Sequence, residues 1–363
     1  MEKAKNRLNW IDIAKGFAII LVVLGHAIRD EMRVDSSVYD YIYKVCYIFH
    51  MSFFFFLSGY TYKLSKNKYG AGAGQIVKKS KTMLVPWLLY SAFIYIVFEV
   101  AINFPLTSDI LTGAGYTNLS PLNYLLRMLA ANNPWSYHLW FIYVLFIVSI
   151  IVILCDMAFK DKSKYVLIAI VAVFLVIQPF ELGKKLGSWS MLFENISKCF
   201  PYFVLGYLVD LKGIAERKWP VWKYIPAILG VAYIFIRAAF FAGKEGSAIS
   251  APTYALKMVI MYLAYALLPF AMFLVCKASY LVSREENNFI VKYIKLFGKE
   301  SFYIYLWHQP FCCAFLGLVL YNKMGLPAIV SVVISAVLSF VVPFMVLWAK
   351  NTAIKIFTKK KNG

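Results

Sequence analysis

Charge is scarce in this 363-residue chain: only 15% of its residues are charged, against roughly 25% in an average soluble protein. Acidic residues are especially few, since 18 Asp and Glu stand against 38 Lys and Arg and leave a net charge of +20. Hydrophobic residues make up 61% of the chain and aromatic residues 18%. This composition excludes an ordinary soluble domain, and we expect an all-α integral membrane protein.

The positive charge does not indicate a nucleic-acid-binding protein. On a chain this apolar, basic residues are better explained as signals of membrane topology and as contacts with anionic lipids. We therefore expect membrane lipids, and no nucleic acid, among the partners.

Cysteine is also sparse, and its six positions show no CxxC spacing. Most of them fall in apolar runs, where a free thiol behaves as a small hydrophobic side chain. The sequence therefore predicts neither a disulfide framework nor a metal site.

Ten apolar segments can be drawn, most of them near the ~20 residues that a helix needs to cross a bilayer. They cover residues 11–28, 42–62, 83–104, 138–158, 165–180, 191–210, 221–241, 252–276, 300–321 and 326–349. The ends and loops on one side of this drawing hold 26 of the Lys and Arg residues, and those on the other side hold 7. The positive-inside rule then predicts a polytopic helix bundle of about ten transmembrane helices with both termini cytoplasmic.

We predict one membrane domain over residues 1–363, with a basic cytoplasmic tail at 350–363. Residues 287–299 are expected to form an amphipathic helix on the inner surface. The basic start and Gly25-His26-Ala27 also fit a cleaved signal peptide. Cleavage would leave an odd number of helices, so we favour an uncleaved first helix.

The first apolar segment carries polar residues that a plain membrane span does not need. Asp12 and Lys15 lie near its start and His26 near its end. Eleven residues turn a helix three times plus about 20°, so Lys15 and His26 share one face about 16 Å apart. One helix face is therefore expected to join a basic membrane edge to a histidine inside the span.

The chain has only four histidines, namely His26, His50, His138 and His308. All four are predicted in the outer half of the membrane or near its midplane. Histidine is costly in hydrocarbon, so such residues usually face the bundle interior and mark a site. For His50 and His138, which lie near predicted interfaces, a role at the headgroup level is the alternative.

The histidines have polar or small neighbours. Ser58 and Gly59 interrupt a phenylalanine run after His50, and small residues of this kind let helices approach closely. In the ninth segment Ser301, Tyr305 and His308 are spaced four and three residues apart, which places them on one helix face.

Five ordered motifs together carry a family resemblance: IDIAKGFAIILVVLGH, FHMSFFFFLSGY, KKSKTMLVPW, HLWF and FGKESFYIYLWH. In this order and spacing the chain resembles the acyltransferase family 3 membrane O-acyltransferases. It is most similar to the branch that includes sugar O-acetyltransferases, such as the fucose 4-O-acetylase-like enzymes. The motifs run from residue 11 to residue 308, so the resemblance covers nearly the whole chain.

The resemblance implies transfer of an acyl group, usually acetyl, from cytoplasmic acyl-CoA to a saccharide hydroxyl. Acetyl-CoA would be a co-substrate, with no tightly bound cofactor, in a bacterial cell membrane. The acceptor would be a polysaccharide, such as an exopolysaccharide, or a lipid-linked precursor. The family's basic residue and catalytic histidine, which have ten residues between them, correspond to Lys15 and His26. Lysine at this position cannot make arginine's planar bidentate contact with an anion.

A basic pair after the second helix, usually arginines in the family, corresponds to Lys78 and Lys81. Ser52 stands where many relatives have proline. The predicted catalytic residues are His26, Lys15 and Asp12, and Lys78 and Lys81 are predicted to bind acyl-CoA. Residues expected to position the acceptor or the transition state are His308, Tyr305, Ser301, His138, Trp140, His50 and Ser58.

Alternatives remain for several of these residues. Asp12 can pair with Lys15 or simply favour the start of the helix. The lysines at 78 and 81 can serve topology alone. For the whole chain, a secondary transporter or a flippase of a lipid-linked saccharide would also use intramembrane histidines, although we find no internal repeat. A scaffolding subunit would not need four placed histidines.

Overall fold

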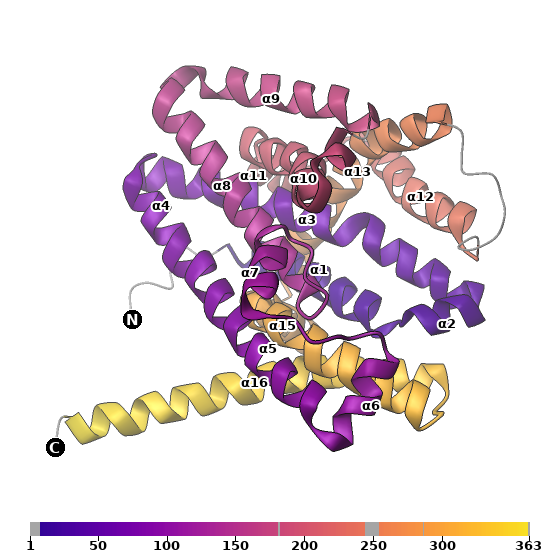
Figure 1. Cartoon of the computed structure of the whole chain (residues 1–363). Coiled ribbons are helices and arrows are strands. Elements are labelled where there is room, and N and C mark those ends of the chain that lie inside the picture. Colours follow the sequence, from indigo (N-terminus) through magenta and orange to yellow (C-terminus); the bar gives the residue numbers. More distant parts are fainter. Residues whose placement is uncertain (1–7, 181, 244–253, 286, 362–363) are drawn as a thin grey trace. The chain divides into compact units, whose positions relative to one another are not determined.

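The computed structural model describes residues 8–180, 182–243, 254–285 and 287–361, and within these ranges it contains helices and no strand (Figure 1). Residues 1–7, the first two residues of the segment expected from residue 252 and the last two residues of the expected tail 350–363 lie outside these ranges. The all-α prediction is confirmed for the described part of the chain.

Eight stretches of the described residues are long and apolar enough to cross a membrane. They are Asn9–Ala27, Ser37–Tyr69, Ala73–Asn103, Tyr137–Ile177, Val221–Phe241, Met258–Val282, Ser301–Lys323 and Ala328–Thr352. The chain is therefore a polytopic membrane helix bundle.

All ten predicted segments are helical where the structure describes them, although the described residues contain only eight stretches that meet the length and hydropathy of a span. The fourth stretch, Tyr137–Ile177, holds two helices, α8 (Trp140–Phe159) and α9 (Ser163–Ile177). They meet at Lys160, whose φ of 48° turns the chain. The helix α10 (Ser190–Leu208) includes Glu194, Lys198 and Pro201 and is less apolar than the eight stretches. The count of ten and the side of the termini stay predictions.

The chain divides into two compact units, and each is described by itself. The first unit comprises Met1–His50, Ile214–Ile249 and Phe270–Gly363. The second comprises Met51–Gly213 and Ser250–Pro269. The prediction of a single domain over 1–363 stays a prediction. Much of the predicted tail 350–363 is helical, because α16 (Ala328–Lys361) continues through it, as the long yellow helix in Figure 1 shows.

Elements of the first unit are mostly long helices with two π-helical turns. They are α1 (Asn9–Ala27), α2 (Asp30–Asp35), the first part of α3 (Ser37–Tyr69), η7 (Val221–Lys223), α12 (Tyr224–Phe241), the last part of α13 (Tyr254–Val282), α14 (Phe289–Lys299), α15 (Ser301–Trp307), η8 (His308–Phe315), η9 (Leu318–Lys323) and α16.

Elements of the second unit include more short helices. They are the rest of α3, α4 (Ala73–Lys79), η2 (Ser80–Leu84), α5 (Val85–Asn103), α6 (Pro105–Gly113), α7 (Pro121–Leu129), η3 (Tyr137–Leu139), α8, η4 (Lys160–Lys162), α9, η5 (Gln178–Phe180), η6 (Leu182–Trp189), α10 and the start of α13, while α11 (Leu211–Glu216) crosses the boundary.

In the first unit α1 and α14 touch through their backbones at two glycines. A Cβ on Gly298 of α14 would lie 1.6 Å from the Asp12 carbonyl oxygen, and one on Gly16 of α1 would lie 1.9 Å from the Ile294 carbonyl oxygen. Only glycine permits so close an approach, as in the small-residue crossings of membrane helices. The amphipathic segment predicted at 287–299 is therefore a helix, and it packs against the start of α1.

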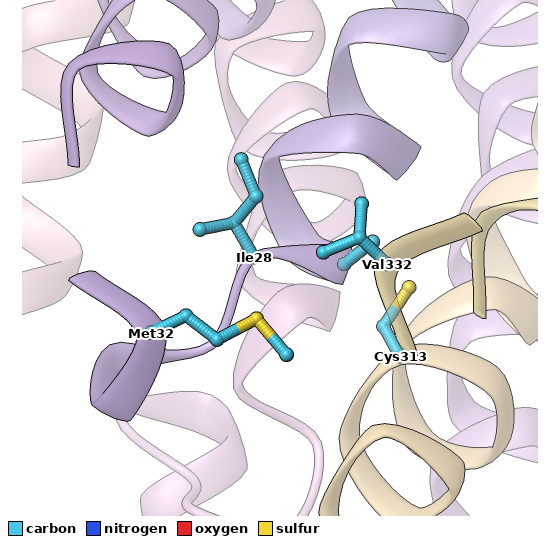
Figure 2. Packing of buried hydrophobic residues seen from close by; sticks show 5 residues of the cluster. Ile28, Met32, Cys313 and Val332 are labelled. Atoms are coloured by element: carbon cyan, nitrogen blue, oxygen red, sulfur yellow. The ribbon is translucent and has the colours of Figure 1, made fainter. Parts of the chain in front are cut away.

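A small apolar cluster closes the far end of α1 (Figure 2). Ala27 and Ile28 follow His26, and Met32 of α2 joins them. Cys313 of η8 and Val332 of α16 complete the cluster, and all five side chains are at most 5% exposed. The cluster holds the end of α1 beside η8, the turn that begins at His308.

The second unit has its own glycine crossing. A Cβ on Gly59 of α3 would lie 1.9 Å from the Phe203 carbonyl oxygen, and one on Gly206 of α10 would lie 1.9 Å from that of Phe56. The predicted close helix approach near Ser58 and Gly59 is confirmed at Gly59.

A buried carboxylate ties four helices of the second unit together. The Asp156 side chain is fully buried, and its Oδ1 accepts hydrogen bonds from Lys66 Nζ at 2.8 Å, Tyr207 OH at 2.8 Å and Ser163 Oγ at 2.6 Å. Its Oδ2 accepts from Tyr62 OH at 2.8 Å. A buried charge is tolerated where donors surround it in this way. The network joins α3, α8 and α10 to the start of α9.

Candidate active site

The first helix places two predicted residues on one continuous element. α1 runs unbroken from Asn9 to Ala27, so Lys15 and His26 lie on the same helix, as predicted. Lys15 and His26 are half-buried, and Asp12 is buried. The crossing with α14 covers the backbone of Asp12 and Gly16, on either side of Lys15. The lysine end of α1 is thus held against α14 and the histidine end against η8.

His26 and His308 lie side by side in the first unit. Their ring centroids are 5.1 Å apart. His308 is fully buried, and the Tyr305 ring lies 5.5 Å from it, centroid to centroid. Two histidines from segments nearly 300 residues apart in sequence therefore form one pair, a juxtaposition that spacing along the chain could not predict.

A change of helix type occurs at His308. α15 ends at Trp307, and the π-helix η8 begins at His308. Pro310 has no N–H to continue the α-helical ladder, which fits a widened turn here. π-Helical turns occur frequently at functional sites. The predicted Ser301, Tyr305 and His308 stripe starts on α15 with half-buried Ser301 and ends on η8.

Backbone carbonyls fix the tautomer of His308. Its Nδ1 lies 2.8 Å from the Tyr305 carbonyl oxygen and 3.2 Å from that of Ile304. Because a carbonyl can only accept, Nδ1 carries the proton and the neutral ring presents a lone pair at Nε2. His50 has the same arrangement, because its Nδ1 donates to the Cys46 carbonyl oxygen. Both neutral rings are therefore acceptors at Nε2.

His50 lies deeper in its helix than the sequence suggests. We predicted it near the start of a segment beginning at residue 42, whereas α3 begins at Ser37 and His50 is fully buried. The extra residues 37–41 include the charged Asp40, which forms an ion pair with Lys44 in the next turn. A hydropathy pattern cannot detect a polar helical extension of this kind.

Tyr47 of α3 was missed by the sequence analysis and lies between two histidines. Its hydroxyl oxygen is 2.7 Å from His26 Nδ1 and 3.4 Å from His26 Nε2. Its ring also packs edge-on against His50, with centroids 4.9 Å apart. The signal was present: Tyr43, Tyr47 and His50 have the same spacing of four and three as Ser301, Tyr305 and His308.

Charged residues gather near α2, outside the membrane-spanning stretches. Arg29 donates to the Ala314 carbonyl oxygen of η8 at 3.1 Å and to Glu31 at 3.0 Å. Burial alone would raise the pKa of the Glu31 carboxyl, but hydrogen bonds from Arg29 and Asn322 outweigh it and leave the pKa below its ordinary value. These contacts fasten α2 to η8 and η9.

The other predicted site residues belong to the second unit. His138 is buried in η3, and Trp140 begins α8. Ser58 is half-buried in α3. Lys78 lies in the last turn of α4 with an exposed side chain, its Nζ 5.4 Å from the Tyr69 ring centroid, and Lys81 is exposed in the π-helix η2. Roles for these five residues stay predictions.

Among the residues that the structure describes, no group of three or more His, Cys, Asp or Glu side chains is arranged to bind a metal ion. The six cysteines are free thiols.

Comparison with known proteins identifies the family. A family model described as an acyltransferase domain matches residues 8–348. A curated relative, the nodulation protein NolL of Mesorhizobium japonicum, is 25% identical over 223 residues, which is 60% of this chain. The chain spans about half the length of that relative, at 52%. No solved structure matches the chain. The family match over nearly the whole helical bundle shows that the chain belongs to the acyltransferase 3 family of membrane O-acyltransferases.

Proposed function

We propose that this protein transfers an acetyl group from cytoplasmic acetyl-CoA to a hydroxyl of a cell-surface or lipid-linked saccharide, with His26 as general base. Membership of the family supports acyl transfer. The observation that carries the assignment of the base is the packing of His26 against His308, at 5.1 Å between ring centroids, with Tyr47 on Nδ1 of His26.

The reaction needs a group that removes the acceptor's proton as its oxygen attacks the thioester. In direct transfer the hydroxyl proton passes to His26 while a C–O bond forms at the acetyl carbonyl carbon. The resulting oxyanion collapses, the C–S bond breaks, and the CoA thiolate takes the proton back from His26. An imidazole suits both steps because its ordinary pKa lies near neutrality. A covalent acyl-enzyme is the other chemical route.

His308 is better suited to hold the acceptor than to polarise the thioester. Its neutral ring presents a lone pair at Nε2, since Nδ1 donates to backbone carbonyls. A lone pair can accept a hydrogen bond from a saccharide hydroxyl but cannot donate one to a developing oxyanion. We therefore assign His308 to a second hydroxyl of the saccharide, next to the hydroxyl whose proton passes to His26.

The two lysines after the second span are proposed to attract the phosphates of the donor. Lys78 and Lys81 have exposed side chains on the predicted cytoplasmic side. Lysine binds phosphate as a point charge, without the fork of arginine. This pair would therefore bind the nucleotide end of acetyl-CoA through charge.

Reversing the charge of Lys81 tests this part of the proposal. We expect Lys81→Glu to raise the apparent KM for acetyl-CoA several-fold at low salt, with a smaller change in kcat, because a phosphate contact becomes a repulsion. Lys162→Glu is the control, since Lys162 is also exposed and predicted cytoplasmic. Equal KM values for the two variants would restrict Lys81 to topology.

Mass spectrometry tests the proposed function as a whole. Surface glycans from cells with the protein should carry one acetyl group that is missing from cells without it. Purified protein in liposomes should transfer labelled acetyl from acetyl-CoA to that glycan. If the liposomes instead move saccharide across the bilayer and form no ester, the transporter alternative replaces the enzyme.

A further inference from the structure

We propose that Tyr47 is a positioning residue for the transfer, which holds His26 in the tautomer with its proton on Nδ1 and its reactive lone pair on Nε2. This inference rests on the proposed role of His26 as the base. The role of Tyr47 is inferred from the contacts between α1 and the first part of α3.

The first step of the argument is the hydrogen bond itself. The Tyr47 hydroxyl oxygen lies 2.7 Å from His26 Nδ1 but 3.4 Å from Nε2, so Nδ1 is the bonded nitrogen. The two rings meet edge to face, with an interplanar angle of 78°. A neutral imidazole has one N–H and one lone pair, so the group on Nδ1 decides what Nε2 presents to a substrate.

The second step concerns the proton of Tyr47. Tyr43 is also a hydrogen-bond partner of Tyr47, and the two rings stack with centroids 4.0 Å apart. The Tyr47 hydroxyl can therefore donate to Tyr43 and accept from His26. In this arrangement Nδ1 of His26 is the donor and Nε2 carries the lone pair that can take a proton.

The third step is that the tyrosine pair is itself anchored. The Arg33 guanidinium lies 3.7 Å from the Tyr43 ring centroid, a cation–π contact. Arg33 Nε also donates to buried Asp40 at 3.1 Å. Asp40 in turn accepts from the Gly243 backbone N–H at 2.8 Å and from Lys44. Ion pairs at the start of α3 thus fix Tyr43, against which Tyr47 is stacked.

A glycine beside His26 makes room for Tyr47. A Cβ on Gly25 would lie 2.9 Å from Tyr47 Cε2 and 3.3 Å from Cys46 Cβ. Both distances are shorter than ordinary carbon contacts, so any larger residue at this position would push the tyrosine ring away. The sequence pair Gly25-His26 therefore supplies both the imidazole and the space for its partner.

His26 differs from His50 and His308 in the group that is hydrogen-bonded to its Nδ1. Backbone carbonyls hold the protons of His50 and His308 on Nδ1. Nδ1 of His26 is instead hydrogen-bonded to a phenol, which can donate or accept. The tautomer of His26 consequently depends on Tyr47, as the tautomer of a triad histidine depends on its carboxylate.

Removing the hydroxyl alone is the test. Tyr47→Phe keeps the ring that stacks on Tyr43, and we expect kcat to fall roughly tenfold to a thousandfold with little change in the KM for acetyl-CoA. Nitrogen NMR of labelled histidine should show the His26 signals, assigned by their loss in His26→Gln, shifting from one tautomer to a mixture. Tyr321→Phe, which removes a hydroxyl bonded to Asp35, is the control and should match the parent.

A second variant guards against a folding defect. Gly25→Ala keeps the Tyr47 hydroxyl but displaces its ring, so it should show the same shift of tautomer and the same loss of kcat. A Tyr47→Phe protein with the parental kcat and unchanged nitrogen shifts would overturn the inference. If His26→Gln also retained full activity, the proposed base itself would be wrong, whereas an inactive His26→Gln beside a fully active Tyr47→Phe would remove only the role of Tyr47.

Discussion

Replacing His26 with glutamine is expected to reduce acetyl transfer by roughly 100-fold to 10,000-fold, the range that a positioned general base contributes. Glutamine keeps polar atoms near the positions of the imidazole but cannot take a proton near neutral pH. The half-buried His26 ring contacts Tyr47 and His308, and neither of these two neighbouring rings can occupy the position of His26 without a rearrangement.

The assay should separate chemistry from binding. Single-turnover transfer of labelled acetyl to the glycan acceptor should slow to the extent stated, while binding of acetyl-CoA should stay at the parental affinity, because the variant leaves Lys78 and Lys81 untouched. The melting temperature of the purified variant checks that it is folded. A folded His26→Gln protein that transfers acetyl at the parental rate would show that the base is elsewhere.

The helices of this chain could be predicted well because hydropathy acts over long segments. The ten apolar segments are helical where the structure describes them. Lys15 and His26 lie on one unbroken helix, and regular helix geometry sets the relative orientation of two residues that are eleven positions apart. Hydropathy was less informative where polar residues extend or interrupt a helix. The turns of α3 before residue 42 and the π-helix at His308 are both of this kind.

Contacts between distant segments could not be predicted in the same way. Histidine scarcity indicated that His26 and His308 matter, but no spacing rule places two rings from α1 and η8 at 5.1 Å. Tyr47 was overlooked because tyrosine is common in this chain, with 26 residues, and aromatic belts explain many of them. Asp156 was overlooked because its four donors come from three separate helices of the second unit, α3, α9 and α10.

Glycines were informative where they interrupt an apolar run, as at Gly59, but Gly298 gave no such signal. It lies in the amphipathic stretch FIVKYIKLFGK, where a glycine near the end of a helix usually indicates termination. In the structure it is instead the point at which α14 meets the backbone of α1. The role of Gly298 became apparent only from the position of Asp12 and Gly16 opposite it.

Gly298→Ala is therefore expected to destabilise the protein strongly. The added Cβ would lie 1.6 Å from the Asp12 carbonyl oxygen and 2.6 Å from the Gly16 nitrogen, and both are backbone atoms that cannot rotate away. Overpacking of side chains typically costs about 1–3 kcal/mol, and a backbone clash should reach or exceed the upper end. We expect the melting temperature of the detergent-solubilised protein to fall by roughly 5–10 °C.

Gly74→Ala is the matched control for this experiment. Gly74 also lies within a helix, α4, but a Cβ there meets no heavy atom within 4 Å. Alanine has the higher helix propensity, so the control should melt at or slightly above the parental temperature. A Gly298→Ala protein that also melts at the parental temperature would mean that α1 and α14 do not touch at this point. Lys15 lies between Asp12 and Gly16, the two residues that the added methyl group would displace. Without the contact between α14 and α1, the structure would no longer explain how the lysine end of α1 is held.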